Sequence, residues 1–312
     1  MDIIKSKVSI IIPTYKRSLF LTRAIDSVLN QTHTNIEIIV VDDNTPGSEH
    51  EKETKITLER YSEDVRVVYH KNKRNFGCAL ARNEGIVAST GDYITFLDDD
   101  DIYLPDKVAS QLQYMLENQL DMSFTALRLH NEDDKLIDYR SFDDIEDFSN
   151  QNLLKYHIMR HLTGTDTFMY KRDFIFKIGA FGDYDMGDEF YLMYKTICNG
   201  AKIGYLDTSY VIAYVHHSDG VSKGDSKITG EKQLFHFKRT QFNLFTKREQ
   251  MFIRYRHHIV LAVTYYRARK SLRFLYHTIR ALFVSPFDFV YEPIKLIRKL
   301  LKVGRYNTES DI

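Results

Sequence analysis

Residues 91–101 read GDYITFLDDDD, an apolar run that ends abruptly in four consecutive carboxylates. The run YITFL (93–97) has the β-branched and aromatic character of a buried strand. Like charges about 6 Å apart repel by roughly 0.7 kcal/mol per pair in water and by about 3 kcal/mol at an effective dielectric of about 20. Four aspartates are therefore tolerable on a solvated loop, whereas in a cleft they need a compensating cation.

Three similar apolar runs precede this stretch, at 8–12 (VSIII), 36–41 (IEIIVV) and 65–69 (VRVVY). Helix-like segments separate the four runs, at 19–31, 53–62 and 78–88. The alternation predicts an α/β fold with a mainly parallel sheet and right-handed crossovers. Ligands of such sheets bind at the carboxyl ends of the strands, where four polar loops begin here: PTYKR, DDNTPG, HKNKRNFG and DDDD.

The rest of the chain continues the alternation and then changes character. Pro105 is suited to the first position of a helix that runs to about 118. We expect a strand at 121–129, a loop at 130–150, and then strand, helix, strand and strand at 166–172, 174–200, 201–207 and 210–217. From 228 to about 303 the pattern is helical, which predicts a catalytic domain at 1–225 and a helical C-terminal region at 226–312.

Composition narrows the class of protein. The 312 residues include only two cysteines, Cys78 and Cys198, so no disulfide framework or CxxC zinc site is expected and a reducing compartment fits best. The N-terminus reads as a strand and not as a signal peptide, and no run of about 18 apolar residues predicts a membrane span. The net charge of zero conceals +13 over 238–306 and −11 over 1–237.

The acidic loops carry the clearest chemical signal. Asp42 and Asp43 end one predicted strand and Asp98–Asp101 follow another, so a parallel sheet brings both groups to one edge. Carboxylates are preferred ligands of Mg²⁺ and Mn²⁺, and Mg²⁺ commonly binds one or two of them together with substrate phosphates. An EF-hand loop is excluded because DDDDIYLPDKV lacks glycine at the sixth position, and no P-loop or GxGxxG turn is present.

Taken in order, VSIIIPTYKR, VVDDN, RNFGCALARNEGI, GDYITFLDDDD, GDEFYLMYK and HHSDGVS resemble the bacterial family 2 glycosyltransferases over residues 6–225. The resemblance implies the GT-A fold, a mainly parallel central sheet flanked by helices, here with a helical C-terminal extension. It also implies inverting transfer of a hexose or N-acetylhexosamine from a UDP-sugar donor to a hydroxyl of a lipid-linked glycan acceptor, with Mn²⁺ or Mg²⁺. The product would be a cell-surface polysaccharide such as a capsule, and synthesis would be non-processive because no QxxRW sequence occurs.

The resemblance also implies roles for individual residues. Metal ligands would be Asp100, Asp98 and His217, with Asp101 left open by the fourth aspartate and His216 a weaker alternative. Gly164, Thr165 and Asp166 lie where the family presents groups to sugar or acceptor, although a simple turn fits them equally. Contacts to the nucleotide-sugar would come from Pro13, Thr14, Tyr15, Arg17, Asp42, Asp43, Asn75, Gly77, Arg82, Asn83, Asp98 and Asp99.

The general base of an inverting transferase is a carboxylate with a pKa raised toward the working pH. The family takes it from an acidic pair that opens a helix, commonly Glu-Asp, and here the order is reversed as Asp188-Glu189. We favour Asp188 as the base, with Glu189 as the alternative. Two ordinary N-terminal helix acids would give the same sequence.

Residues 248–303 mix aromatic, aliphatic and basic side chains, most clearly in KLIRKLLK (295–302), and such surfaces bind anionic membranes. We expect a cytoplasmic protein in peripheral contact with the inner face of the cell membrane. A helical cap with a solvated basic face is the alternative, and no motif supports nucleic acid as a partner. Two rival functions are a non-catalytic nucleotide-sugar-binding module that has lost its base and a nucleotidyltransferase, which would typically have a glycine-rich first loop unlike PTYKRS.

Overall fold

The structure, a computed structural model, describes residues 3–162, 164–184, 186–216 and 224–309 of the chain, with side chains described up to residue 298 except at 224 and 225. Two compact units make up the chain. The larger unit comprises residues 1–150, 163–183 and 188–215, and the smaller unit comprises 151–162, 184–187 and 216–312.

The larger unit contains a seven-stranded sheet in the order β10-β6-β9-β4-β1-β2-β3. All its neighbouring strands are parallel except β9, which runs antiparallel to β4 and to β6, so the predicted mainly parallel sheet is confirmed. The strands are β1 (Val8–Thr14), β2 (Ile36–Asp42), β3 (Val67–Lys71), β4 (Tyr93–Phe96), β6 (Met122–Thr125), β9 (Met169–Lys171) and β10 (Ile203–Leu206).

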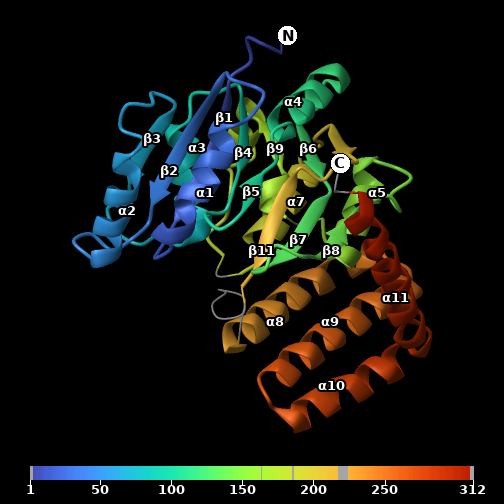
Figure 1. Cartoon of the computed structure of the whole chain (residues 1–312). Coiled ribbons are helices and arrows are strands. Elements are labelled where there is room, and N and C mark those ends of the chain that lie inside the picture. The colour runs from blue at the N-terminus through green and yellow to red at the C-terminus, as the bar shows by residue number, and fades with distance from the viewer. Residues whose placement is uncertain (1–2, 163, 185, 217–223, 310–312) are drawn as a thin grey trace. The chain divides into compact units, whose positions relative to one another are not determined.

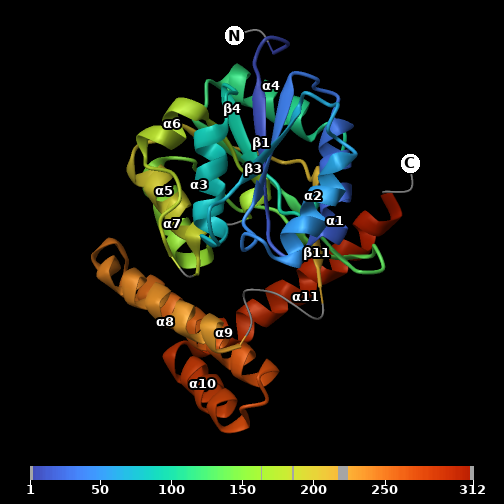
Figure 2. The same ribbon diagram turned by 90° about the vertical axis from the view of Figure 1, so that its left-hand side faces the viewer.

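Helices cover both faces of this sheet, which explains why every residue of β1 and β2 is buried. Ile10 and Ile12 of β1 pack into the core that α1 covers, and the intervening Ile11 faces α3. Figure 2 shows α3 on one side of the strands and α1 and α2 on the other. The helices are α1 (Ser18–Leu29), α2 (Glu49–Glu59), α3 (Cys78–Ala88) and α4 (Lys107–Asn118), the last beginning two residues after Pro105.

A second sheet departs from the prediction. The expected strand at 121–129 is two strands, β6 and β7 (Leu127–Asn131), that belong to different sheets. The expected loop at 130–150 contains β8 (Leu136–Arg140), which forms a hairpin with β7. These strands join β5 (Ile102–Tyr103) and β11 (Val211–Val215) in the order β5-β11-β7-β8.

The predicted helix at 174–200 is also two elements, α6 (Arg172–Lys177) and α7 (Asp188–Cys198). Gly179 and Ala180 adopt positive φ after α6, which reverses the chain direction there. Before β9 the 3₁₀ helix η1 (Thr165–Thr167) replaces the start of the strand expected at 166–172. Because the predicted helix is divided, α7 begins directly at the Asp188-Glu189 pair.

The smaller unit is helical, as predicted for 228–303. Helices α8, α9 and α10 run side by side in it (Figure 1), and a complete capping box of Thr246 and Glu249 begins α9. Among the residues that the structure describes, no helix combines the length and the apolar content that crossing a bilayer requires. The elements are α5 (Asn150–Arg160), α8 (Gly224–Thr240), η2 (Phe242–Leu244), α9 (Lys247–Arg267), α10 (Ser271–Val284) and α11 (Pro286–Glu309).

Candidate active site

The carboxyl ends of β1, β2 and β4 bring the predicted loops together. Thr14 is paired with Asp42 in the register of β1 and β2. The acidic loop Asp98–Asp101 begins two residues after the end of β4, and the Thr14 hydroxyl donates a hydrogen bond to the Asp99 carboxylate at 2.7 Å. Burial raises the pKa of Asp99 to about 7 although this hydrogen bond opposes the shift. Asp99, Asp100 and Asp101 are all buried, so most of the loop is part of the folded interior and not a solvated run of charge.

Arg82 joins two predicted parts of the site that lie far apart in the sequence. Its side chain, from α3, is only 5% exposed and donates to Asp98 at 2.6 Å and to Asp188 at 3.0 Å. Its Nε atom is buried and has no hydrogen-bond acceptor among the described residues. One guanidinium therefore holds the acidic loop and the start of α7 within a single hydrogen-bonded group, and charge-assisted bonds of this kind are the stronger class.

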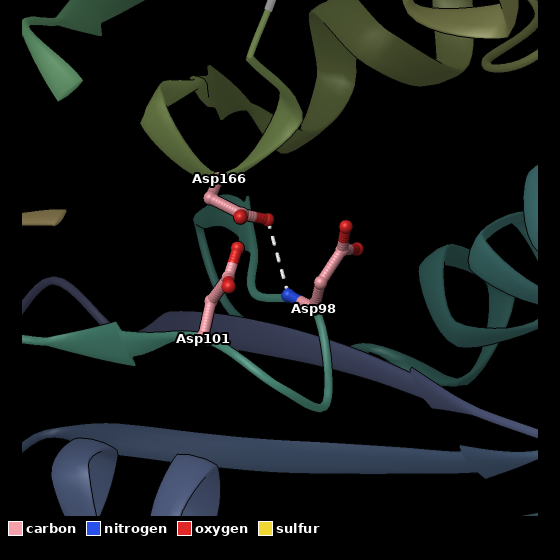
Figure 3. A group of neighbouring side chains, drawn as sticks. All are labelled: Asp98, Asp101 and Asp166. Carbon is pink, nitrogen blue, oxygen red and sulfur yellow. Dashed lines mark hydrogen bonds between the residues drawn. The ribbon is translucent and has the colours of Figure 1, made fainter. Parts of the chain in front are cut away.

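Asp98, Asp101 and Asp166 form a group of three carboxylates whose oxygens lie within 4.8 Å of one another. Figure 3 shows Asp166 reaching from η1 toward the acidic loop, where its carboxylate accepts the backbone N–H of Asp98 at 3.1 Å. The backbone N–H of Tyr214 in β11 donates to Asp101 at 2.8 Å. Burial, with the charge of Asp98 adding to it, raises the pKa of Asp166 to about 7.

The same group is suited to a divalent cation. Burial and the charge of Asp166 raise the pKa of Asp101 well above its usual range, so the two carboxyl groups retain a proton between them. Hard oxygen ligands at this spacing match Mg²⁺ or Mn²⁺, which would replace that proton. Asp98 was among the expected metal ligands, and Asp166 was expected only as a sugar or acceptor contact or a turn residue.

The structure does not bring the other two expected metal ligands, Asp100 and His217, into this group of described carboxylates. The carboxylate of Asp100 is paired with the Arg17 guanidinium, which also lies 3.6 Å from Asp99. His217 falls outside the residues that the structure describes. Metal binding by Asp100 and by His217 stays a prediction.

A third arginine, which the sequence did not single out, holds the backbone of the acidic loop. Arg23 of α1 donates to the carbonyl oxygen of Asp100 at 2.8 Å, and its guanidinium carbon lies 3.9 Å from the ring centre of Tyr214. The Tyr214 hydroxyl donates to Asp134 at 2.6 Å. We refer to Arg23 and Tyr214 as the loop clamp, because Tyr214 also holds Asp101 through its backbone.

The predicted base and ribose contacts, Asp42 and Asp43, are buried and saturated by the chain. Asp42 accepts the Tyr69 hydroxyl and the Asn44 backbone N–H, each at 2.8 Å. Asp43 accepts hydrogen bonds at 2.8–2.9 Å from three residues of the loop between β3 and α3, namely Asn72, Phe76 and Gly77. Asp43 therefore shapes the loop that begins α3, and contact of either aspartate with a nucleotide stays a prediction.

Other predicted ligand contacts have structural partners as well. Asn75 donates to the Asp43 carbonyl at 3.0 Å, and Asn83 exchanges two hydrogen bonds with the backbone of Phe181, at 2.9 and 3.0 Å. Pro13 is buried within β1, while Tyr15 is exposed after it. Asn83 thus positions the segment before α7, and Tyr15 remains open to solvent.

The two carboxylates of the acidic pair, Asp188 and Glu189, lie in different environments. Asp188 is held by Arg82, whereas Glu189 accepts a hydrogen bond from the Thr165 hydroxyl at 3.3 Å. Burial, with the negative charge of Asp188 adding to it, raises the pKa of Glu189 to about 7. A carboxyl group titrating there is matched to general-base work at neutral pH.

A mainly parallel sheet with carboxylates gathered at its strand ends is the architecture of GT-A transferases. The profile described as Glycosyl transferase family 2 matches residues 9–182, more than half of the chain. The chain belongs to this family.

Similar proteins agree with this assignment. The putative teichuronic acid biosynthesis glycosyltransferase TuaG of Bacillus subtilis is 36% identical over 135 residues, covering 43% of this chain and 52% of that protein. An uncharacterized glycosyltransferase of Rickettsia bellii is 40% identical over 133 residues, covering 43% of this chain and 18% of that protein. The matches thus span from about a fifth to about half of these relatives.

Solved structures show the same fold. Residues 1–349 of S. aureus TarS, in complex with UDP-GlcNAc, match with a TM-score of 0.59 at 18% identity, covering 89% of this chain and 91% of that one. The UDP complex of the same protein matches with a TM-score of 0.56 at 19% identity, with the same two coverages.

Proposed function

We propose that the protein is an inverting, metal-dependent glycosyltransferase that transfers a hexose or N-acetylhexosamine from a UDP-sugar to a hydroxyl of a lipid-linked glycan in surface-polysaccharide synthesis. The observation that carries the proposal is Arg82, which holds Asp98 and Asp188 together. Carboxylates suited to a metal-bound diphosphate and carboxylates suited to proton abstraction therefore share one site. TuaG, by its name in teichuronic acid synthesis, and TarS, solved with UDP-GlcNAc, support the donor and the product class.

In this proposal Asp98, Asp101 and Asp166 hold Mn²⁺ or Mg²⁺. When bound, the ion supplies Lewis-acid neutralisation of the diphosphate leaving group. Arg17, which is paired with Asp100 beside Asp99, would donate hydrogen bonds to phosphate oxygens. Because the proposed acceptor is lipid-linked, the enzyme would act in peripheral contact with the inner face of the cell membrane.

We assign the base to Glu189 in preference to Asp188, which the sequence favoured. The acceptor oxygen forms its bond to the anomeric carbon as the bond to the diphosphate oxygen breaks, and Glu189 takes the hydroxyl proton. Its raised pKa and its Thr165 contact suit this role. Asp188, bound to Arg82, positions the guanidinium that links the two halves of the site.

The test is UDP release from a panel of UDP-sugars with Mn²⁺, with and without EDTA and acceptor. We expect Glu189→Gln to lose transfer by about 10²-fold or more while UDP binding, measured by calorimetry, is unchanged. The matched control is Glu63→Gln, an exposed glutamate in a turn, which should behave as wild type. Binding of UDP without turnover of any donor would favour the non-catalytic module, and full transfer by Glu189→Gln would refute the base.

A further inference from the structure

Helices α10 and α11 each expose a row of apolar side chains at helical spacing. On α10 the row occupies positions i, i+3, i+4, i+7, i+10 and i+11, and its members are between 41% and 86% exposed. It consists of Leu272, Leu275, Tyr276, Ile279, Leu282 and Phe283. The row on α11 is 42% to 63% exposed and consists of Phe287, Val290, Tyr291, Ile294 and Ile297. We call these the outer rows. Apolar patches this extensive are rare on soluble monomers and mark interaction surfaces.

The exposed charged side chains between residues 266 and 298, on and beside the outer rows, are all basic. The two acidic residues between 266 and 298 are both held in ion pairs within the helical unit: Asp288, 3% exposed, receives both Arg248 nitrogens, and Glu292 receives Arg160 at 3.0 Å. The basic side chains in the same interval are all exposed, namely Arg267, Arg269, Lys270, Arg273, Arg280, Lys295 and Arg298. The surface that the outer rows occupy is therefore apolar and cationic.

The turn between α9 and α10 adds a hollow of about 550 Å³ beside the α10 row. Tyr266, Arg267, Arg269, Ser271 and Phe274 line it. Two guanidinium groups and a hydroxyl offer hydrogen-bond donors to a phosphate, and the two rings offer apolar surface to the chain that carries it. This combination suits the headgroup region of a phospholipid.

We propose that the outer rows lie in the interfacial layer of an anionic phospholipid bilayer, with the hollow at Arg267 and Arg269 taking a headgroup phosphate. An apolar face with a basic border is what helices in this layer present. A second copy of this chain is the less suitable occupant, because pairing two such faces would bring like charges together. The inference rests on the membrane contact proposed above and deepens it. The sequence predicted this contact for 248–303, most clearly at 295–302, and the outer rows assign it to α10 and α11.

The experiment is sedimentation of the full-length protein with vesicles of phosphatidylcholine alone or mixed with phosphatidylglycerol. We expect binding to the mixed vesicles only. Leu275→Ser with Phe283→Ser, and separately Arg267→Glu with Arg269→Glu, should each weaken binding by about tenfold or more. The matched control is Ile56→Ser with Val65→Ser, two apolar residues of the larger unit that are 66% and 95% exposed, and it should bind as wild type.

Several results would overturn the proposal. One is that the wild-type protein does not bind the mixed vesicles, and another is that the Leu275→Ser/Phe283→Ser variant binds them equally well. A third is that light scattering shows a dimer for the wild type and a monomer for this variant. Retained binding by the Arg267→Glu/Arg269→Glu variant would remove the hollow from the proposal and so overturn it in that form. Circular dichroism establishes that each variant is folded. UDP release measured without vesicles should be equal in all of them, so failure of the transferase proposal and failure of the membrane proposal give different results.

Discussion

Glu189 and Asp188 are neighbours in sequence with different electrostatic surroundings, and the difference has a measurable consequence. Because the pKa of Glu189 is raised to about 7, its base form is the minor species below that pH. We expect kcat/KM for the acceptor to rise with pH through about 7 and to level off above it. A profile that is flat between about pH 6 and 8, measured with donor saturating, would contradict this role for Glu189.

The loop clamp gives a second expectation for individual residues. Arg23→Gln removes a charged hydrogen bond to the Asp100 carbonyl and a contact with the Tyr214 ring, together worth about 2 kcal/mol. We expect the apparent KM for Mn²⁺ to rise by about tenfold while the protein remains folded. The control is Arg60→Gln, whose guanidinium also lies over a tyrosine ring but away from the acidic loop. An unchanged KM for Mn²⁺ would show that the clamp does not position the ligands.

The sequence predicted residues that lie next to strand ends and, through the family resemblance, Arg82 and Asp166, but it did not single out Arg23 or Tyr214. Asp98 and the Asp188-Glu189 pair follow recognisable local patterns. Arg23 and Tyr214 lie within a helix and a strand with no local signal, and Asp166 was expected as a sugar or acceptor contact or a turn residue, not as a member of the acidic group. Their roles arise only when α1, β11 and η1 are brought to the acidic loop, and such tertiary proximity cannot be read from local sequence.

Helix α3 packs closely against β1 at Gly85. A Cβ atom placed on Gly85 would lie 2.4 Å from the Cγ2 atom of Ile11 in β1. We expect Gly85→Ala to destabilise the protein by about 1–3 kcal/mol, because overpacking outweighs the gain in helix propensity. Thermal unfolding measures the effect, with Val87→Ala, at an exposed position of the same helix, as control. A rise in melting temperature for Gly85→Ala would mean that α3 can move away from β1.

The sequence predicted the strands and helices that have strong apolar periodicity, but it did not predict where one element ends and the next begins. The first four strands and α3 agree with the sequence pattern closely. The run at 121–129 reads as one strand because apolar side chains recur through β6 and into the start of β7, and only Ala126 separates the two strands. The hairpin strand β8 is half exposed and lies in an acidic segment, so its pairing with β7 supplies order that its composition does not indicate.

For the whole molecule, the carboxyl groups with raised pKa values link stability to pH and to metal. Asp99 and Asp166, each with a pKa raised to about 7, bind more protons in the folded than in the unfolded state between about pH 4 and 7. The free energy of unfolding of the metal-free protein should therefore decrease as pH rises from about 4 to about 7, by the contribution of these two groups. Mn²⁺ should raise the melting temperature more at pH 8 than at pH 6, since it competes with the retained protons.

The matching experiment is thermal unfolding in EDTA and in Mn²⁺ across this pH range. Asp166→Asn should remove most of the metal-dependent increase, whereas Asp133→Asn, an exposed control in the β7–β8 turn, should not. Equal increases at both pH values would contradict the linkage.

The antiparallel strand β9 joins the two parts of the seven-stranded sheet. In the sheet order it lies between β4 and β6, so β6 and β10 join the N-terminal strands only through it. Pairing of β6 and β10 with the rest of this sheet therefore depends on residues 169–171, which follow β6 by more than forty residues in the chain. Because Asp166 lies three residues before β9, the strand that joins the two parts of the sheet also holds this carboxylate beside the acidic loop, at the proposed cation site.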